Sequence, residues 1–68
     1  MLGRYRTTNP IISMFAINGH HEAKTVPAGT EVDLNGKKLN GDRLMEVTVD
    51  GHLVLMFTED LKMSTMPI

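Results

Sequence analysis

The chain has 68 residues, no cysteine and a formal net charge of −1 with neutral histidines. This length allows one small domain, and the absence of cysteine excludes disulfides, thiolate nucleophiles and cysteine-based zinc sites. The near-zero charge supplies no general attraction to nucleic acid or to an anionic membrane. Because so small a domain is marginally stable alone, self-association or a histidine-based metal site would be a natural source of extra stability.

Turn signals along the chain predict an all-β fold. Asn-Gly, Asp-Gly and Pro/Gly pairs interrupt the apolar segments and leave no room for a long helix. We expect strands at residues 5–8, 11–17, 22–26, 30–35, 43–50 and 52–58, followed by one helical turn at 59–61. Residues 1–62 would form the domain and 63–68 a flexible C-terminal tail.

The N-terminal residues faintly resemble a signal peptide, but we do not favour that interpretation. Basic residues precede a short apolar stretch at 11–17, but no small-residue cleavage site follows it. No apolar run approaches the length of a membrane span. We therefore expect a cytoplasmic protein without a membrane partner.

The register of the last predicted hairpin follows from its turn. If Asp50 and Gly51 form a two-residue type I′ turn, Val49 pairs with His52. Counting outward, Val47 then pairs with Val54, and Met45 with Met56. These side chains share one face of the sheet, which we assign to the core. The full predicted core is Ile12, Met14, Val26, Val32, Leu34, Met45, Val47, Val49, Val54, Met56 and Leu61.

The opposite face of this hairpin is unusually apolar. Beside Glu46 and Thr48 it carries Leu44, Leu53, Leu55 and Phe57. Strands read as continuous apolar runs when both of their faces are covered. The cover would be the N-terminal segment, the tail, another copy of the chain or a ligand, and these alternatives remain open.

Residues 24–61 resemble the bacterial SH3-like small barrels. The segment TVPAGTEVDL is similar to their diverging turn, RLMEVTVDGHLVLMF to their distal hairpin, and TEDL to the helical turn before their last strand. The resemblance implies a single barrel of five or six short antiparallel strands. The whole chain also resembles short bacterial proteins of this barrel type for which no activity is established.

Departures from the family pattern limit what the resemblance implies for function. The aromatic cluster that binds polyproline ligands in eukaryotic members is missing, and Val54-Leu55 replaces the Gly-Trp pair of secreted bacterial members. The type II dihydrofolate reductases, which are similar barrels, line a tetramer pore with a Val-Gln-Ile-Tyr segment. The corresponding residues 53–57 contain no Gln or Tyr, so those catalytic residues do not carry over. An oligomeric pore enzyme is thus the least favoured interpretation.

Two polar groups are candidates for other chemistry. The first group is His20, His21 and Glu22, whose side chains are of types that bind metal ions. Adjacent side chains of a strand point to opposite faces, however, so we favour a solvated turn and expect no metal or other cofactor.

The second group is a local basic patch that could bind nucleic acid. Its members would be Arg4, Tyr5, Arg6, Lys37, Lys38 and Arg43. Eight acidic against seven basic residues favour scattered charge instead.

The preferred function is a non-enzymatic interaction module. We expect it to self-associate, or to bind a protein partner, through Leu44, Leu53, Leu55 and Phe57, because contiguous exposed apolar patches mark interfaces. No nucleophile–base pair, carboxylate pair or phosphate loop is apparent in the sequence. The alternative is a nucleic-acid-binding small barrel.

Overall fold

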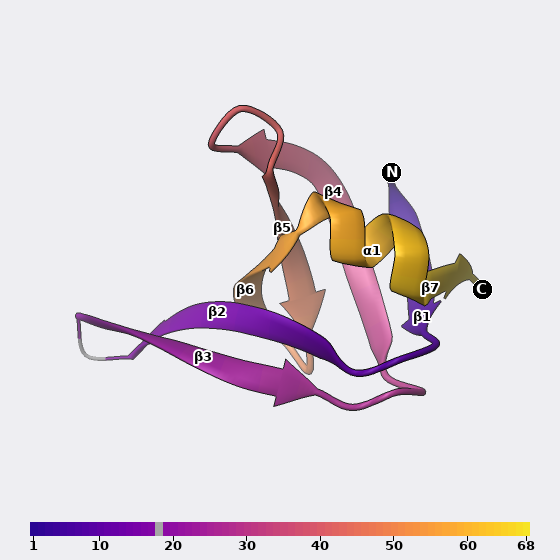
Figure 1. The fold of residues 1–68 in the computed structure, drawn as a ribbon, viewed down its shortest axis with the longest axis horizontal. Helices are drawn as coiled ribbons and strands as arrows, with labels where there is room; N and C mark the ends of the chain where they lie inside the picture. The colour runs from indigo at the N-terminus through magenta and orange to yellow at the C-terminus, as the bar shows by residue number, and fades with distance from the viewer. Residues whose placement is uncertain (18) are drawn as a thin grey trace.

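A computed structural model of the protein describes residues 1–17 and 19–68. It contains strands and one helix, which confirms the all-β class (Figure 1). The elements in chain order are β1 (Gly3–Thr7), β2 (Ile11–Ile17), β3 (His20–Val26), β4 (Glu31–Leu39), β5 (Leu44–Val49), β6 (His52–Phe57), α1 (Thr58–Ser64) and β7 (Thr65–Pro67).

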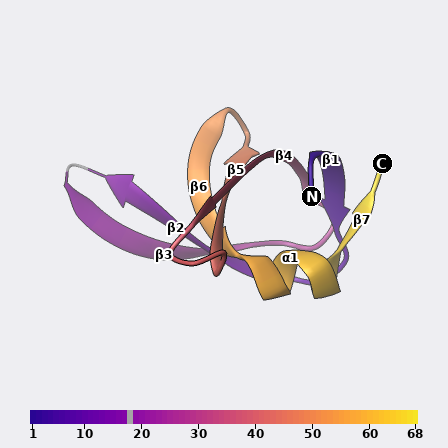
Figure 2. The ribbon, with the colours of Figure 1, turned by 90° about the horizontal axis from the view of Figure 1, so that it is seen from above.

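The strands of the described residues form one antiparallel, seven-stranded sheet in the order β3-β2-β6-β5-β4-β1-β7. The sheet curls, and α1 joins β6 to β7 across the space between them (Figure 2). It is not a closed barrel, which corrects the expected five- or six-stranded barrel. In the described residues β2 pairs with β6 through Ser13 and Met14 alone, and the β2–β3 hairpin then extends away from the body. The end strands β3 and β7 therefore do not meet, and barrel closure would require them to pair.

The hairpin of β5 and β6 has the predicted register. Val49 pairs with His52, and the remaining residues pair in order up to Leu44 with Phe57. Asp50 and Gly51 adopt φ angles of 51° and 76°, as a type I′ turn requires at both central positions. The local turn chemistry therefore fixed the pairing of these two strands.

Strand β4 continues through an Asn-Gly pair that was expected to form a turn. The predicted strand 30–35 extends to Leu39, with a register shift between Leu34 and Lys38. Asn35 Oδ1 accepts the N–H of Lys37 at 2.8 Å, and Gly36 has a φ of 83°. The Asn-Gly pair thus forms a β-bulge, in which a glycine with positive φ is common.

The core lies on the concave side of the sheet and includes most of the predicted residues. The buried apolar residues are Ile11, Val26, Val32, Leu34, Met45, Val47, Val54, Met56 and Leu61, with Val49 partly buried against them. The assignment of Ile12 and Met14 to the core is wrong. Ile12 is 52% exposed and Met14 is half-buried on the opposite face.

The buried hydroxyl of Ser13 explains why Ile12 and Met14 were wrongly assigned to the core. Ser13 is buried, and its Oγ donates to the carbonyl oxygen of Lys24 at 2.9 Å. Because this bond satisfies the hydroxyl, the polar residue can face the core together with Ile11. Treating Ser13 as a solvent-facing residue shifts the inferred face of β2 by one position.

The C-terminal residues expected to form a flexible tail carry regular structure. The predicted turn at 59–61 lies within the longer helix α1, which extends to Ser64. Strand β7 follows directly and pairs with β1. Leu61 is fully buried and anchors the helix to the core. Among the described residues, no helix is long and apolar enough to span a bilayer.

Candidate functional site

The convex side of the sheet carries a set of apolar side chains that we call the outer apolar face. Its residues come from strands β2, β4, β5 and β6: Ile12, Met14, Leu39, Leu44, Leu53, Leu55 and Phe57. Directly opposed residues of neighbouring strands share a face, so the register itself groups these side chains. The set includes all four interface residues predicted from the sequence and adds Ile12, Met14 and Leu39.

Two rows of paired residues run across this face. One row places Leu39 opposite Leu44 and Leu44 opposite Phe57. The other places Leu55 opposite Met14, and Met14 opposite Ala23 on β3. Apolar residues of neighbouring strands are therefore side by side in these two rows, whereas Leu55 and Leu53 face Glu46 and Thr48 on β5.

The face is not covered by the rest of the chain. Leu53 is 58% exposed and Phe57 is 44% exposed, whereas Leu44 and Leu55 are half-buried by their neighbours. The N-terminal segment offers no cover, because β2 lies beside β6 in the same sheet and contributes Met14 to the same face. Within this chain the outer side of β6 (LVLMF, residues 53–57) is therefore not fully covered, and cover by another copy or by a ligand stays a prediction.

Glu46 bounds the outer apolar face on the β4 side. Its Oε1 accepts a hydrogen bond from Asn35 Nδ2 at 3.2 Å, and its Oε2 lies 3.4 Å from Lys37 Nζ. The Glu46 side chain is only 15% exposed. The β4 bulge thus supplies both partners that neutralise and hold this carboxylate, and the polar boundary is fixed in place.

A groove on the concave side was not foreseen from the sequence. It has a volume of about 530 Å³ and lies where the β2–β3 hairpin separates from the β5–β6 hairpin. Its lining includes the apolar residues Phe15, Val49 and Val54 and the exposed polar residues Asp50 and His52. The volume is in the range of small-ligand pockets. Only the divergence of the two hairpins, which is a long-range property, creates it.

The histidine pair lies on the exposed strand β3. His20, His21 and Glu22 are all exposed, and they pair with successive residues of β2, so they alternate between the two faces. In the part of the chain that the structure describes, no three His, Cys, Asp or Glu side chains are grouped to hold a metal ion.

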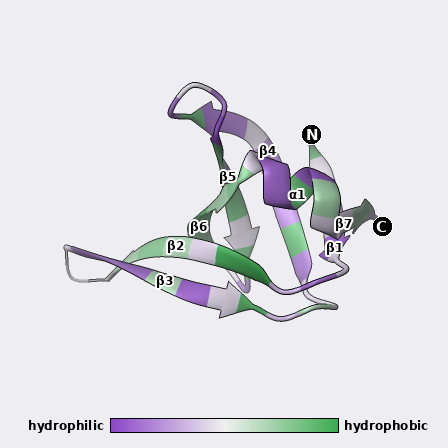
Figure 3. Cartoon of the chain, in the orientation of Figure 1, coloured by the Kyte–Doolittle hydropathy of each residue, from purple (hydrophilic) through white to green (hydrophobic). Residues whose placement is uncertain are grey.

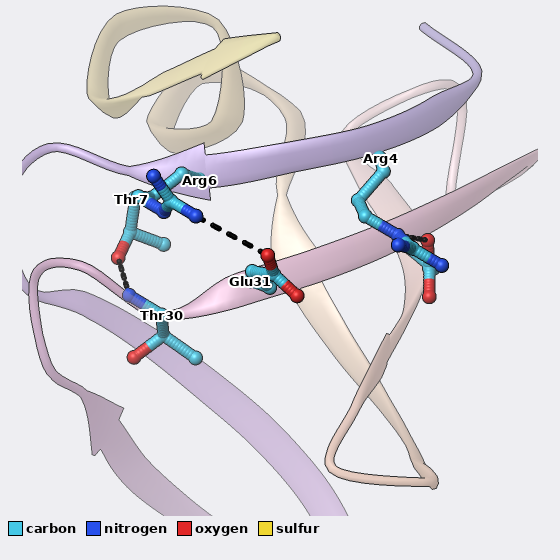
Figure 4. A network of polar contacts seen from close by, with 6 residues as sticks. Arg4, Arg6, Thr7, Thr30 and Glu31 are labelled. Carbon is cyan, nitrogen blue, oxygen red and sulfur yellow. Dashed lines mark hydrogen bonds and ion pairs between the residues drawn. The ribbon is translucent and has the colours of Figure 1, made fainter. Parts of the chain in front are cut away.

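The basic residues of the predicted nucleic-acid patch are largely paired with carboxylates. Arg4 Nε lies 3.3 Å from Asp33 Oδ1, and Arg6 Nη2 lies 3.2 Å from Glu31 Oε1 (Figure 4). Tyr5 is partly buried against the core, on the opposite side of β1 from both arginines. A nucleic acid would therefore have to stack on Tyr5 at one face of β1 and contact Arg4 and Arg6 at the other.

The other predicted basic residues are dispersed. Lys37 is paired with Glu46, Lys38 follows the β4 bulge, and Arg43 lies in the turn between β4 and β5. Within the described residues the structure thus offers an apolar face and a concave groove more clearly than a basic surface.

Comparison of the chain with protein-family models, with curated proteins and with solved structures finds no match.

Proposed function

We propose that this protein is a non-enzymatic interaction module that self-associates through the outer apolar face. The observation that supports this proposal most directly is the exposure of Leu53 and Phe57, two large members of the outer apolar face. Large contiguous apolar patches are uncommon on soluble monomers and tend to mark interfaces. Burying the patch would also add stability to a domain too small to form a large core.

The proposed contact combines exposed apolar residues with a polar boundary. Phe57 and Leu53 supply its exposed apolar area, and Glu46 with its partners forms a polar boundary. Interfaces commonly combine an apolar centre with a polar rim. The hydropathy pattern along β2, β5 and β6 is consistent with this surface, whereas β3 carries hydrophilic residues along much of its length (Figure 3).

The test is the molar mass in solution, measured by light scattering over a hundredfold concentration range. We expect the wild-type chain to exceed its monomer mass of 7.6 kDa, and Leu53→Glu or Phe57→Glu to lower that mass, because each places a charge in the apolar contact. The effect should depend little on salt, since the contact is not ionic.

The matched control is Met63→Glu. Met63 is 78% exposed on α1 and is not one of the residues of the outer apolar face, so the same change of chemistry there should leave the mass unaltered. A wild-type monomer at every concentration, or an equal response to Met63→Glu, would contradict the proposal.

A further inference from the structure

The two edges of the sheet are protected to different degrees. The β7 edge has three residues and includes Pro67, which has no N–H to donate. The β3 edge has seven residues without proline, and six of them are exposed. Proteins usually shorten or interrupt edge strands to prevent pairing with other chains. Strand β3 is therefore the edge that remains open to a partner strand.

The hydrogen bonds between β2 and β3 indicate which backbone groups of β3 are available. The carbonyl oxygen of Lys24 accepts a bond from Ser13 Oγ at 2.9 Å, so this carbonyl faces β2. In an antiparallel pair the backbone polar groups of successive residues alternate sides. The N–H and C=O groups of His21, Ala23 and Thr25 therefore face away from β2, toward the open side.

From this arrangement we infer that β3 pairs antiparallel with β3 of a second copy, about a two-fold axis through Ala23. His21 of each copy is then opposite Thr25 of the other, and Ala23 is opposite itself. These are the residues whose backbone groups face the open side, so each pair can exchange two N–H···O bonds. The contact is isologous and closes as a dimer.

The charges on β3 select this register. With the axis at Ala23, Glu22 of each copy lies opposite Lys24 of the other, at the non-hydrogen-bonded positions where opposed side chains are closest. A shift of the axis by one residue would place Glu22 or Lys24 opposite itself, and directly opposed like charges are destabilising. An edge lysine ordinarily discourages pairing, but here it meets a carboxylate.

The same pairing would extend an apolar row across the two molecules. Ala23 is opposite Met14, which is opposite Leu55 on the outer apolar face. The two-fold axis would place the corresponding row of the second copy next to Ala23. The inference concerns the backbone edge and the charges of β3, so it is separate from the proposed contact through the outer apolar face.

A disulfide probe tests the edge contact specifically. Hydrogen-bonded residues opposed across an antiparallel pair have Cα atoms about 5.5 Å apart, within the range that a disulfide spans. Because the chain has no cysteine, Ala23→Cys introduces a single thiol at the axis. The control, Ala28→Cys, places a thiol at another exposed position, in the turn before β4. We expect the Ala23→Cys dimer to form at least about tenfold faster than the Ala28→Cys dimer, because pairing raises the effective thiol concentration.

Charge reversal tests the register. Adding Lys24→Glu to Ala23→Cys opposes two carboxylates at both symmetric positions and should slow the disulfide about tenfold. Adding Glu22→Lys as well should restore the rate, because each introduced lysine then faces the introduced glutamate of the other copy. Both side chains are exposed, and circular dichroism confirms that each variant is folded.

The outcomes separate this inference from the proposed function. Equal rates for Ala23→Cys and Ala28→Cys, or no rescue by the double reversal, would overturn the edge pairing whatever the outer apolar face does. A fast Ala23→Cys disulfide that persists with Phe57→Glu supports the edge pairing, even if Phe57→Glu leaves the molar mass unchanged and the proposed face contact fails.

Discussion

Three buried hydroxyl side chains connect segments that are distant in the sequence. Ser13 donates to the carbonyl of Lys24, Thr58 to the carbonyl of Asp42, and Thr7 to the carbonyl of Pro27. Among the described residues, no buried side-chain nitrogen or oxygen lacks a partner. In a core this small, each hydroxyl therefore acts as a specific connection and not as an unsatisfied polar group.

Thr7 makes the most extensive of these connections. Its Oγ1 donates to Pro27 O at 2.9 Å and accepts the N–H of Thr30 at 3.0 Å, while its backbone bonds to Gly29 and Thr30 (Figure 4). Because Thr7 is only 2% exposed, water cannot replace the hydroxyl. The end of β1 is thereby fixed to the turn that precedes β4.

We predict that Thr7→Val lowers the free energy of unfolding by about 1–3 kcal/mol. Valine has nearly the same shape, but it leaves the Thr30 N–H without its side-chain acceptor, whereas Pro27 O keeps the bond from Thr30 Oγ1. Urea unfolding followed by circular dichroism measures the change. Thr8→Val, at the exposed neighbouring position, is the control and should change stability by less than about 0.5 kcal/mol. Equal losses at the two positions would contradict the role given to the hydroxyl.

At the scale of elements, strand β2 provides a direct test of which face is buried. Ile11 is 2% exposed and Ile12 is 52% exposed. We predict that Ile11→Val lowers the free energy of unfolding by about 0.5–1.5 kcal/mol and that Ile12→Val changes it by less than about 0.5 kcal/mol. Both changes remove one methylene and keep a β-branched residue, so strand propensity cancels in the comparison. A larger loss for Ile12→Val would support the assignment of Ile12 to the core that was first predicted from the sequence.

The elements that could be predicted from the sequence are those set by local chemistry. The Asp50-Gly51 turn determines the β5–β6 register within a few residues of chain, and this prediction was confirmed. The face of β2 could not be read in the same way, because the burial of Ser13 depends on the carbonyl of Lys24 across the hairpin. The bulge at Gly36 was likewise missed, since an Asn-Gly pair is compatible with both a turn and a bulge.

At the scale of the whole molecule, the arrangement depends on pairings between distant segments. Strand β1 pairs with β4 on one side and with β7 on the other, which no local pattern indicates. The apolar residues of the outer apolar face could be named from the hairpin register. The exposure of these residues could not be predicted, because it depends on β2 lying beside β6 in the sheet and not over its outer side.

The pairing of β7 with β1 joins the two ends of the described chain. Ile68 N–H donates to Arg4 O at 3.1 Å, and Thr8 N–H donates to Ser64 O at 2.7 Å. Strand β7 also covers the outer edge of β1, whose five residues contain no proline. Removing β7 would therefore both loosen β1 and create a new open edge.

We predict that a chain ending at Ser64 loses about 1–3 kcal/mol of unfolding free energy, because each backbone hydrogen bond contributes about 0.5–1.5 kcal/mol net. The exposed β1 edge should also make this chain aggregate faster, which light scattering over time would detect. Met66→Ala is the control: Met66 is 55% exposed, and its replacement keeps the backbone pairing. If the shortened chain matched the wild type in urea midpoint and in aggregation rate, β7 would have no stabilising role, and the protection of this edge would have to come from β1 itself.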